Sequence, residues 1–217
     1  MKTFRFSKTY QGRCVLRLPA LELPAGTITA VVGANGSGKS TMARVLAGIV
    51  PPDGKTPRAP HPAVGYLPQQ SYAFRMSVEK NILLNGKDRE RAAEMMRALK
   101  LDELKKQGAK KLSGGESAKM ALIRLLMGRY ELLILDEPTA AMDMESTLAA
   151  EELIRRACRE TGCAALLITH SIRQARRMAE RVIVLHKGEL IEQGETESVL
   201  TAPQQEQTRR FLDYFGT

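Results

Sequence analysis

One short segment constrains the fold of this chain more than any other. It reads Gly33-Ala34-Asn35-Gly36-Ser37-Gly38-Lys39-Ser40 and fits the pattern G-x-x-x-x-G-K-[ST] in full. The apolar stretch 27–32 precedes it as a predicted strand, and residues 40–47 follow it as a predicted helix. In this context the pattern is a phosphate-binding loop, because its glycines let backbone N–H groups surround phosphate oxygens. The segment therefore predicts an α/β fold that binds a nucleotide.

Particular side chains of this loop have predicted roles. Lys39 places a cation on the β- and γ-phosphate oxygens, and the Ser40 hydroxyl is a ligand for Mg²⁺. The competing interpretation is a glycine turn that merely opens a helix, and the strand before the loop argues against it. We expect further contacts to the phosphates from Gly33, Asn35, Gly36, Ser37 and Gly38 of this segment and from Thr41 directly after it.

A second motif is an apolar strand that ends in two carboxylates. Residues 132–135 are all Leu or Ile, and Asp136 and Glu137 follow directly. Side chains at the carboxyl end of a parallel strand face the ligand crevice, so Asp136 can reach the metal ion and Glu137 the γ-phosphate. Glu137 would then polarise the attacking water. The alternative is that the two acids only cap the turn at Pro138, and the upstream phosphate loop favours the catalytic interpretation.

Composition limits the remaining possibilities. A chain of 217 residues with 43% hydrophobic content can bury one sizeable core. Its longest apolar runs are far shorter than the roughly 20 residues that cross a bilayer, and the N-terminus alternates polar and apolar residues without the apolar core of a signal peptide. We therefore expect a cytoplasmic protein. Cys14, Cys158 and Cys163 have no metal-ligand spacing and are interpreted as buried or idle thiols.

The net charge of +9 could indicate a nucleic-acid partner. The basic residues are spread along predicted helix faces, however, and there are no basic clusters with aromatic residues of the kind that stack on bases. We therefore expect no nucleic acid as a partner.

The order of elements along the chain predicts a mostly parallel sheet covered on both faces. Strands at 3–7 and 14–18 are joined by a loop that holds Tyr10, the Pro-rich stretch 51–62 is an exposed connection, and a short strand at 64–67 returns to the core. Residues 77–112 form a compact helical subdomain, with one apolar helix face made by Ala92, Met95, Met96 and Leu99. The expected elements that follow are helix 114–129, strand 132–135, helix 144–159, strand 165–169, helix 173–179, and a hairpin of 182–186 with 189–193.

A third motif gives the chain a specific resemblance. Leu112-Ser113-Gly114-Gly115-Glu116 resembles the signature sequence of ABC ATPases, which usually ends in Gln. In that family the signature helix of one subunit closes over the γ-phosphate that the partner subunit holds, and a helix N-terminus suits an anion physically. Ser113 and Glu116 also match a capping box, and both interpretations can hold together. We expect Ser113, Gly114, Gly115 and Glu116 to contact nucleotide.

Four smaller matches follow the order of the same family. Gln69 resembles the Q-loop glutamine that contacts Mg²⁺ and the attacking water, although Gln70 is an adjacent alternative. Asp143 resembles the D-loop residue at the dimer interface, and His170 resembles the switch histidine that contacts the γ-phosphate. Tyr10 resembles the aromatic residue that stacks on adenine, with a tyrosine packed against the sheet as its rival.

The resemblance covers nearly the whole chain. It implies a P-loop NTPase of ABC type, with a core of 1–76 and 113–217, an N-terminal antiparallel β subdomain, and ATP and Mg²⁺ as cofactors. It also implies a second ATP-binding subunit as partner in a homodimer, an integral membrane permease, an extracytoplasmic solute-binding protein, and a place on the inner face of the cell membrane.

The resemblance further predicts the import of a small solute. Glu116 and the tail at 208–212 are similar to those of importers for oxyanions such as tungstate, molybdate or phosphate. The alternatives are a soluble ABC-type ATPase that acts on nucleic acid or ribosomes, and a phosphate-loop kinase, which would need no signature motif.

Overall fold

The computed structural model describes residues 2–54 and 63–215, so residues 55–62 of the predicted connection lie outside the described part. Within these ranges, eight strands form one sheet in the order β1-β2-β8-β7-β3-β6-β5-β4. Strands β7, β3, β6, β5 and β4 run parallel, whereas β1–β2 and β7–β8 are antiparallel pairs. The strands are β1 (Lys2–Tyr10), β2 (Arg13–Leu23), β3 (Ile28–Val32), β4 (Val64–Leu67), β5 (Leu132–Asp136), β6 (Ala164–Ile168), β7 (Arg181–His186) and β8 (Glu189–Glu195).

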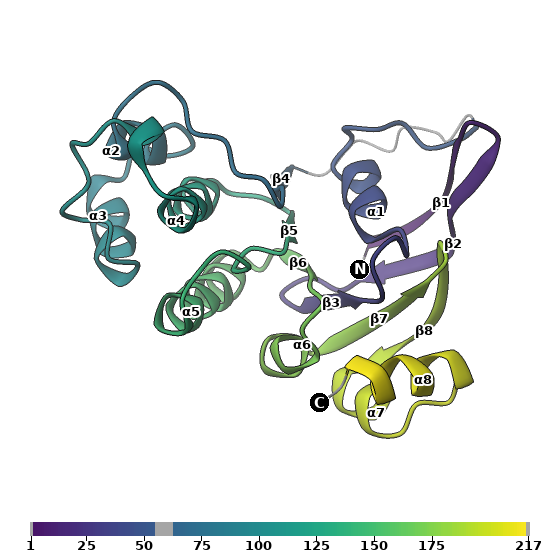
Figure 1. The fold of residues 1–217 in the computed structure, drawn as a ribbon. Coiled ribbons are helices and arrows are strands. Elements are labelled where there is room, and N and C mark those ends of the chain that lie inside the picture. Colours follow the sequence, from purple (N-terminus) through teal and green to yellow (C-terminus); the bar gives the residue numbers. More distant parts are fainter. Residues whose placement is uncertain (1, 55–62, 216–217) are drawn as a thin grey trace.

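Helices cover both faces of this sheet, as the alternating pattern predicts (Figure 1). They are α1 (Lys39–Leu46), α2 (Val78–Ile82), α3 (Arg89–Ala98), the 3₁₀ helix η1 (Ala109–Lys111), α4 (Gly114–Leu126), α5 (Met144–Thr161), α6 (Ile172–Met178), α7 (Thr196–Thr201) and α8 (Glu206–Phe215). In Figure 1, α1 lies on one side of β3, β7 and β8, and α6, α7 and α8 lie on the other.

Alternation along the strands divides the core into two clusters. Val31 of β3 packs in the cluster that contains residues of α1 and β2. Its neighbours Ala30 and Val32 pack in the cluster that contains residues of α4, α5 and α6. Successive strand residues point to opposite faces, and all the residues of β3, β5 and β6 are buried. The central strands are thus apolar on both faces, as a covered parallel sheet requires.

The helical part of the chain lies beside the sheet at the β4 edge. Figure 1 shows α2, α3 and α4 grouped there, away from α1. The predicted apolar face of α3 is buried, since Ala92, Met95 and Met96 are each no more than 3% exposed. Helix α4 contacts α2 and α3, and also β4 and α5. It therefore connects this part to the sheet, and the boundary at residue 112 stays a prediction.

Several element boundaries differ from the sequence expectation. Tyr10 is the last residue of β1 and not part of a loop, because β1 and β2 pair along their length up to a turn at Gln11 and Gly12. The tail expected at 208–212 lies within α8. No helix within residues 2–54 and 63–215 combines the length and the hydropathy that a membrane span requires.

Candidate functional site

The glycine loop runs from the end of β3 into α1. Gly33 has φ of 152° and Gly38 has φ of 104°, backbone conformations that favour glycine. A Cβ atom added to Gly33 would lie 2.2 Å from the carbonyl oxygen of Leu185, so the backbone of β7 passes too close for any other residue. The sequence pattern therefore specifies this loop for reasons of backbone geometry.

Lys39 holds a cation inside the loop. Its Nζ donates hydrogen bonds to the carbonyl oxygens of Gly33 at 2.7 Å and Ala34 at 3.0 Å, and the residue is 7% exposed. Burial lowers the pKa of Lys39, while the nearby carboxylates of Glu137 and Asp136 raise it. The loop therefore brings the lysine close to the acidic pair at the end of β5, as the two motifs predict.

The other loop residues are arranged as an anion site would need. Asn35 and Gly36 are exposed, and Thr41 is half-buried at the start of α1. The Ser37 hydroxyl is buried and has no hydrogen-bond partner in the part of the chain that the structure describes. Because buried polar atoms are normally paired, this hydroxyl is suited to a ligand with acceptor oxygens.

Asp136 ends β5 next to Ser40. The residue is 3% exposed, and its carboxylate accepts a hydrogen bond from the Ser40 hydroxyl and a long one, 3.5 Å, from the Tyr66 hydroxyl. Burial raises the pKa of Asp136, the bond from Ser40 lowers it, and the charge of Glu137 raises it. A hydroxyl and a carboxylate brought together are hard oxygen donors of the kind that Mg²⁺ prefers, so these residues fit the metal.

Glu137 and His170 meet at the ends of two paired strands. Glu137 Oε1 lies 3.1 Å from His170 Nδ1, and the histidine side chain is 64% exposed whereas that of Glu137 is 14% exposed. Glu137 has φ of 51°, and its N–H donates to the Ile168 carbonyl oxygen at 3.0 Å. Strained backbone of this kind is concentrated at functional sites. Together the two residues line one side of a cleft, where a carboxylate can orient a water molecule.

A polar network forms part of the wall of this cleft, because Thr139, Gln174 and Arg177 line it. The Gln174 side-chain amide of α6 donates to Thr139 Oγ1 at 2.9 Å and to Glu151 Oε1 at 3.0 Å. Arg177 donates two hydrogen bonds to the same carboxylate, at 2.7 and 3.1 Å. The network ties the loop after Glu137 to the helix that follows His170.

The signature segment forms the N-terminus of α4. Ser113 is its N-cap, and its hydroxyl accepts a hydrogen bond from Glu116 N at 3.3 Å. Glu116 Oε2 accepts from the Ser113 backbone N–H at 2.8 Å and from its hydroxyl at 2.9 Å. These bonds, the backbone one first, lower the pKa of Glu116. The predicted capping box is present, and it keeps the carboxylate of Glu116 within the cap.

The signature segment contacts the predicted D-loop of the same chain. Gly114 is open to solvent, but a Cβ atom on Gly115 would lie 2.7 Å from the carbonyl oxygen of Ala141. Asp143 caps α5, and its carboxylate accepts from Ser146 N at 2.8 Å. That bond, with a second from the Ser146 hydroxyl, lowers the pKa of Asp143 to about 2. The two motifs thus lie against each other at Gly115 and Ala141.

The structure does not join two of the predicted residues to the rest. Gln69 is exposed between β4 and α2, and its side chain makes no hydrogen bond within the described ranges. Tyr10 is 44% exposed at the end of β1, with Lys8 Nζ 5.2 Å from the centre of its ring. The ring is therefore not part of the core. The roles of both residues stay predictions.

Sequence reasoning missed residues that support the site. Tyr66 and Arg44 lie near Asp136, and Gln174 and Glu151 form the network behind Glu137. Arg44 stands four residues after Ser40, the spacing that places two side chains on one helix face, so its position could have been found. The network joins residues far apart in the chain, and no local pattern indicates it.

Comparisons with known proteins identify relatives of this chain that bind ATP. A family model described as ABC transporter matches residues 16–140. The zinc import ATP-binding protein ZnuC of Yersinia enterocolitica is 35% identical over 219 residues, which cover 98% of this chain and 83% of that protein. The aliphatic sulfonates import ATP-binding protein SsuB 1 of Rhizobium johnstonii is 35% identical, and the match covers 84% of this chain and 72% of that protein. The phosphate import ATP-binding protein PstB 2 of Natronomonas pharaonis is 30% identical, covering 95% and 84%.

Solved structures show the same fold. An ATP-binding subunit of an ABC transporter aligns with a TM-score of 0.80 and 20% identity, covering 99% of this chain and 94% of that one. A dimeric ATP-binding cassette in a post-hydrolysis state with ADP and Pi aligns with a TM-score of 0.77 and 22% identity, covering 89% and 97%. The sequence relatives and the family model show family membership in addition to the fold. The chain therefore belongs to the ABC transporter family, as one of its ATP-binding and ATP-hydrolysing subunits.

Proposed function

We propose that the chain is one half of a two-subunit motor, in which each ATP lies between the phosphate loop of one copy and the signature helix of the other. One observation carries this proposal. The phosphate loop opens α1 and the signature opens α4, and Figure 1 shows these helices far apart in one chain. No hydrogen bond or ion pair joins 33–40 to 113–116 within the described residues. A single chain therefore offers two separate anion-binding helix ends, and a second copy brings them together.

Within such a composite site we assign each predicted residue a role. On the first chain, Lys39 contacts the β- and γ-phosphates, Glu137 holds the attacking water and His170 contacts the γ-phosphate. Residues Gly33, Asn35, Gly36, Ser37, Gly38 and Thr41 surround the phosphates, and Tyr10 stacks on adenine. The second chain contributes Ser113, Gly114, Gly115, Glu116 and Asp143.

The metal ligands in this proposal are Ser40, Asp136 and Gln69. The hydrogen bond between Ser40 and Asp136 supports the first two, whereas Gln69 would have to approach from its exposed loop. Bound Mg²⁺ supplies positive charge against the phosphates. In this proposal Glu137 orients the attacking water.

We further propose that the motor drives a membrane permease from the inner face of the cell membrane and imports a small solute. The names of the relatives support import, because each is an import ATP-binding protein. Those names give zinc, sulfonates and phosphate as cargo, so an oxyanion stays a prediction and a metal ion is its competitor. A solute-binding protein outside the membrane is the third expected component.

The Glu137→Gln variant tests the catalytic assignment. The substitution keeps the shape of the side chain and removes its charge, so ATP hydrolysis should fall about a hundredfold or more. Size-exclusion chromatography with ATP should then show a stable dimer. Glu152→Gln, an exposed carboxylate on α5, serves as the control. Undiminished hydrolysis in Glu137→Gln would contradict the role of Glu137.

Co-purification separates the proposed function from its alternatives. An integral membrane protein isolated together with the chain supports transport. RNA or ribosomes isolated with it would instead support a soluble ABC-type ATPase, and transfer of phosphate to a soluble acceptor would support a kinase.

A further inference from the structure

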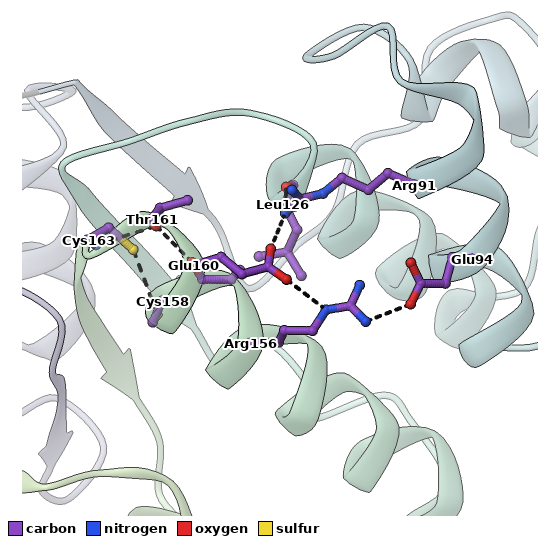
Figure 2. A network of polar contacts seen from close by, with 9 residues as sticks. Arg91, Glu94, Leu126, Arg156, Cys158, Glu160, Thr161 and Cys163 are labelled. Carbon is purple, nitrogen blue, oxygen red and sulfur yellow. Dashed lines mark hydrogen bonds and ion pairs between the residues drawn. The ribbon is translucent and has the colours of Figure 1, made fainter.

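Two buried cysteines lie side by side where α5 ends and β6 begins. Cys158 is in the last turn of α5, Cys163 directly precedes β6, and Gly162 ends the helix between them. Their sulfurs are 3.8 Å apart and share a hydrogen bond. Figure 2 shows the two side chains directed toward each other. A disulfide bond is about 2.05 Å long, so an approach of about 1.8 Å would join the sulfurs.

One of the two cysteines lines a small crevice. Cys163 lines it together with Ala157 and Thr161 of α5 and Arg91 of α3. Arg91 brings a positive charge, and its Nε is buried without a hydrogen-bond partner within residues 2–54 and 63–215. Cys163 is 6% exposed and Cys158 2% exposed, so Cys163 is the more accessible of the two.

The two thiols differ in their tendency to ionise. The hydrogen bond that it shares with Cys158 lowers the pKa of Cys163 to about 6, burial opposes the change, and the Thr161 hydroxyl supports it. The same bond and burial raise the pKa of Cys158. Of the two thiols, Cys163 is therefore the one that ionises more readily. This is the arrangement of an attacking and a resolving cysteine.

We propose that Cys158 and Cys163 form a redox site, which a hydroperoxide such as hydrogen peroxide converts reversibly into an intrachain disulfide. The Cys163 thiolate attacks one peroxide oxygen; an S–O bond forms, the O–O bond breaks, and the departing hydroxide takes a proton to become water. The Cys158 thiol then attacks the Cys163 sulfur. An S–S bond forms, the S–O bond breaks, and the leaving hydroxide takes the Cys158 proton. Two thiols are oxidised, and one peroxide is reduced to two waters.

The disulfide acts on the ion pairs that hold α3 against α5. Glu160 lies between the two cysteines in sequence and pairs with Arg91 of α3 at 3.5 Å and with Arg156 at 3.3 Å. Arg156 also pairs with Glu94 of α3 at 2.6 Å, and Figure 2 shows this chain of contacts from one helix to the other. Closing the gap between the sulfurs moves the last turn of α5 and Glu160 with it. Oxidation therefore loosens the attachment of the helical part.

The chemical test uses the full chain with Cys14→Ser, which removes the exposed third thiol. The folded protein is treated with hydrogen peroxide, alkylated and digested with trypsin, which cleaves after Arg159 and separates the two cysteines. We expect both free thiols to be lost together, a linked pair of peptides to appear, and dithiothreitol to restore both thiols. In Cys158→Ala, Cys163 should stop at the sulfenic acid, which dimedone traps. Two thiols that stay alkylatable, or one oxidised without the linked pair, would overturn the proposal.

Hydrogen–deuterium exchange tests the consequence. In the oxidised Cys14→Ser chain, the amides of α3 should exchange about twofold faster, the scale expected for the loss of a surface ion pair. Dithiothreitol should reverse the change, and peroxide-treated Cys158→Ala should not show it. Unchanged exchange in α3 despite a formed disulfide would overturn the link between the cysteines and these ion pairs.

Discussion

Replacing Glu151 by alanine should destabilise the chain strongly. The carboxylate is 0% exposed and accepts hydrogen bonds from Gln174 at 3.0 Å and from Arg177 at 2.7 and 3.1 Å. These bonds connect α5 with α6, and through Gln174 they also reach Thr139 in the loop after the acidic pair. Glu151→Ala removes the one group on which the network converges.

The size of the effect follows from which groups lose their partner. Removing one member of a buried ion pair costs about 3–5 kcal/mol. The Arg177 side chain is 45% exposed, so water can solvate the freed guanidinium, and Gln174 keeps its bond to Thr139. We therefore expect a cost of about 3 kcal/mol, at the lower end of that range. In a chain of this length that corresponds to a fall in Tm of about 8 °C.

Glu152 provides a matched control on the same helix. It is exposed and pairs with Arg155 at 3.3 Å and Arg159 at 2.8 Å. Surface pairs contribute about 0–1 kcal/mol, so Glu152→Ala should lower Tm by no more than about 3 °C. Thermal unfolding followed by circular dichroism measures both variants. Equal Tm values for the two variants would refute the reasoning that burial makes Glu151 the important carboxylate.

Two further predictions concern the motif residues. Gly115→Ala should lower the free energy of unfolding by more than about 1 kcal/mol, because its Cβ would meet the Ala141 carbonyl oxygen. Gly114→Ala is the control and should be tolerated, because nothing lies within 4 Å of its Cβ. Equal free energies of unfolding for the two variants in urea would contradict this contact. Asp143 has a pKa of about 2 in the folded chain and about 3.9 in the unfolded chain. Its ionised carboxylate therefore stabilises the fold fully at pH values above about 3.9, and this stabilisation is lost as the pH falls through about 2. Asp143→Asn should therefore flatten the acid dependence of stability between about pH 5 and pH 2, and an unchanged slope would count against it.

Local patterns predicted most of the fold. The glycine loop with its flanking strand and helix, the hairpin turned at Lys187 and Gly188, and the capping box at Ser113 and Glu116 each depend on residues close together in sequence. Such features are visible in one sequence because residues close together carry the pattern, even where a distant contact such as that of Gly33 with Leu185 adds to it.

Features that depend on distant partners could not be predicted. Glu151 stands in a helix that the sequence indicates correctly, but its burial depends on Arg177, 26 residues away. Glu137 has φ of 51° where its N–H donates to the Ile168 carbonyl oxygen of β6, and no sequence motif indicates this conformation. The sequence indicates only a tail at 208–212, whereas the structure has helix α8 there, and Glu192 of β8 accepts hydrogen bonds from Gln204 N and Gln205 N just before its start.

A mixing experiment tests the composite ATP site most directly. Lys39→Ala removes the phosphate-loop cation, and Gly114→Asp puts a negative charge at an exposed helix N-terminus, where it suits the helix but repels phosphate. Each variant alone should hydrolyse almost no ATP. An equal mixture forms mixed dimers with one intact site each, and should recover about a quarter of the wild-type rate per chain. A mixture as inactive as its two components would contradict a site shared between two copies.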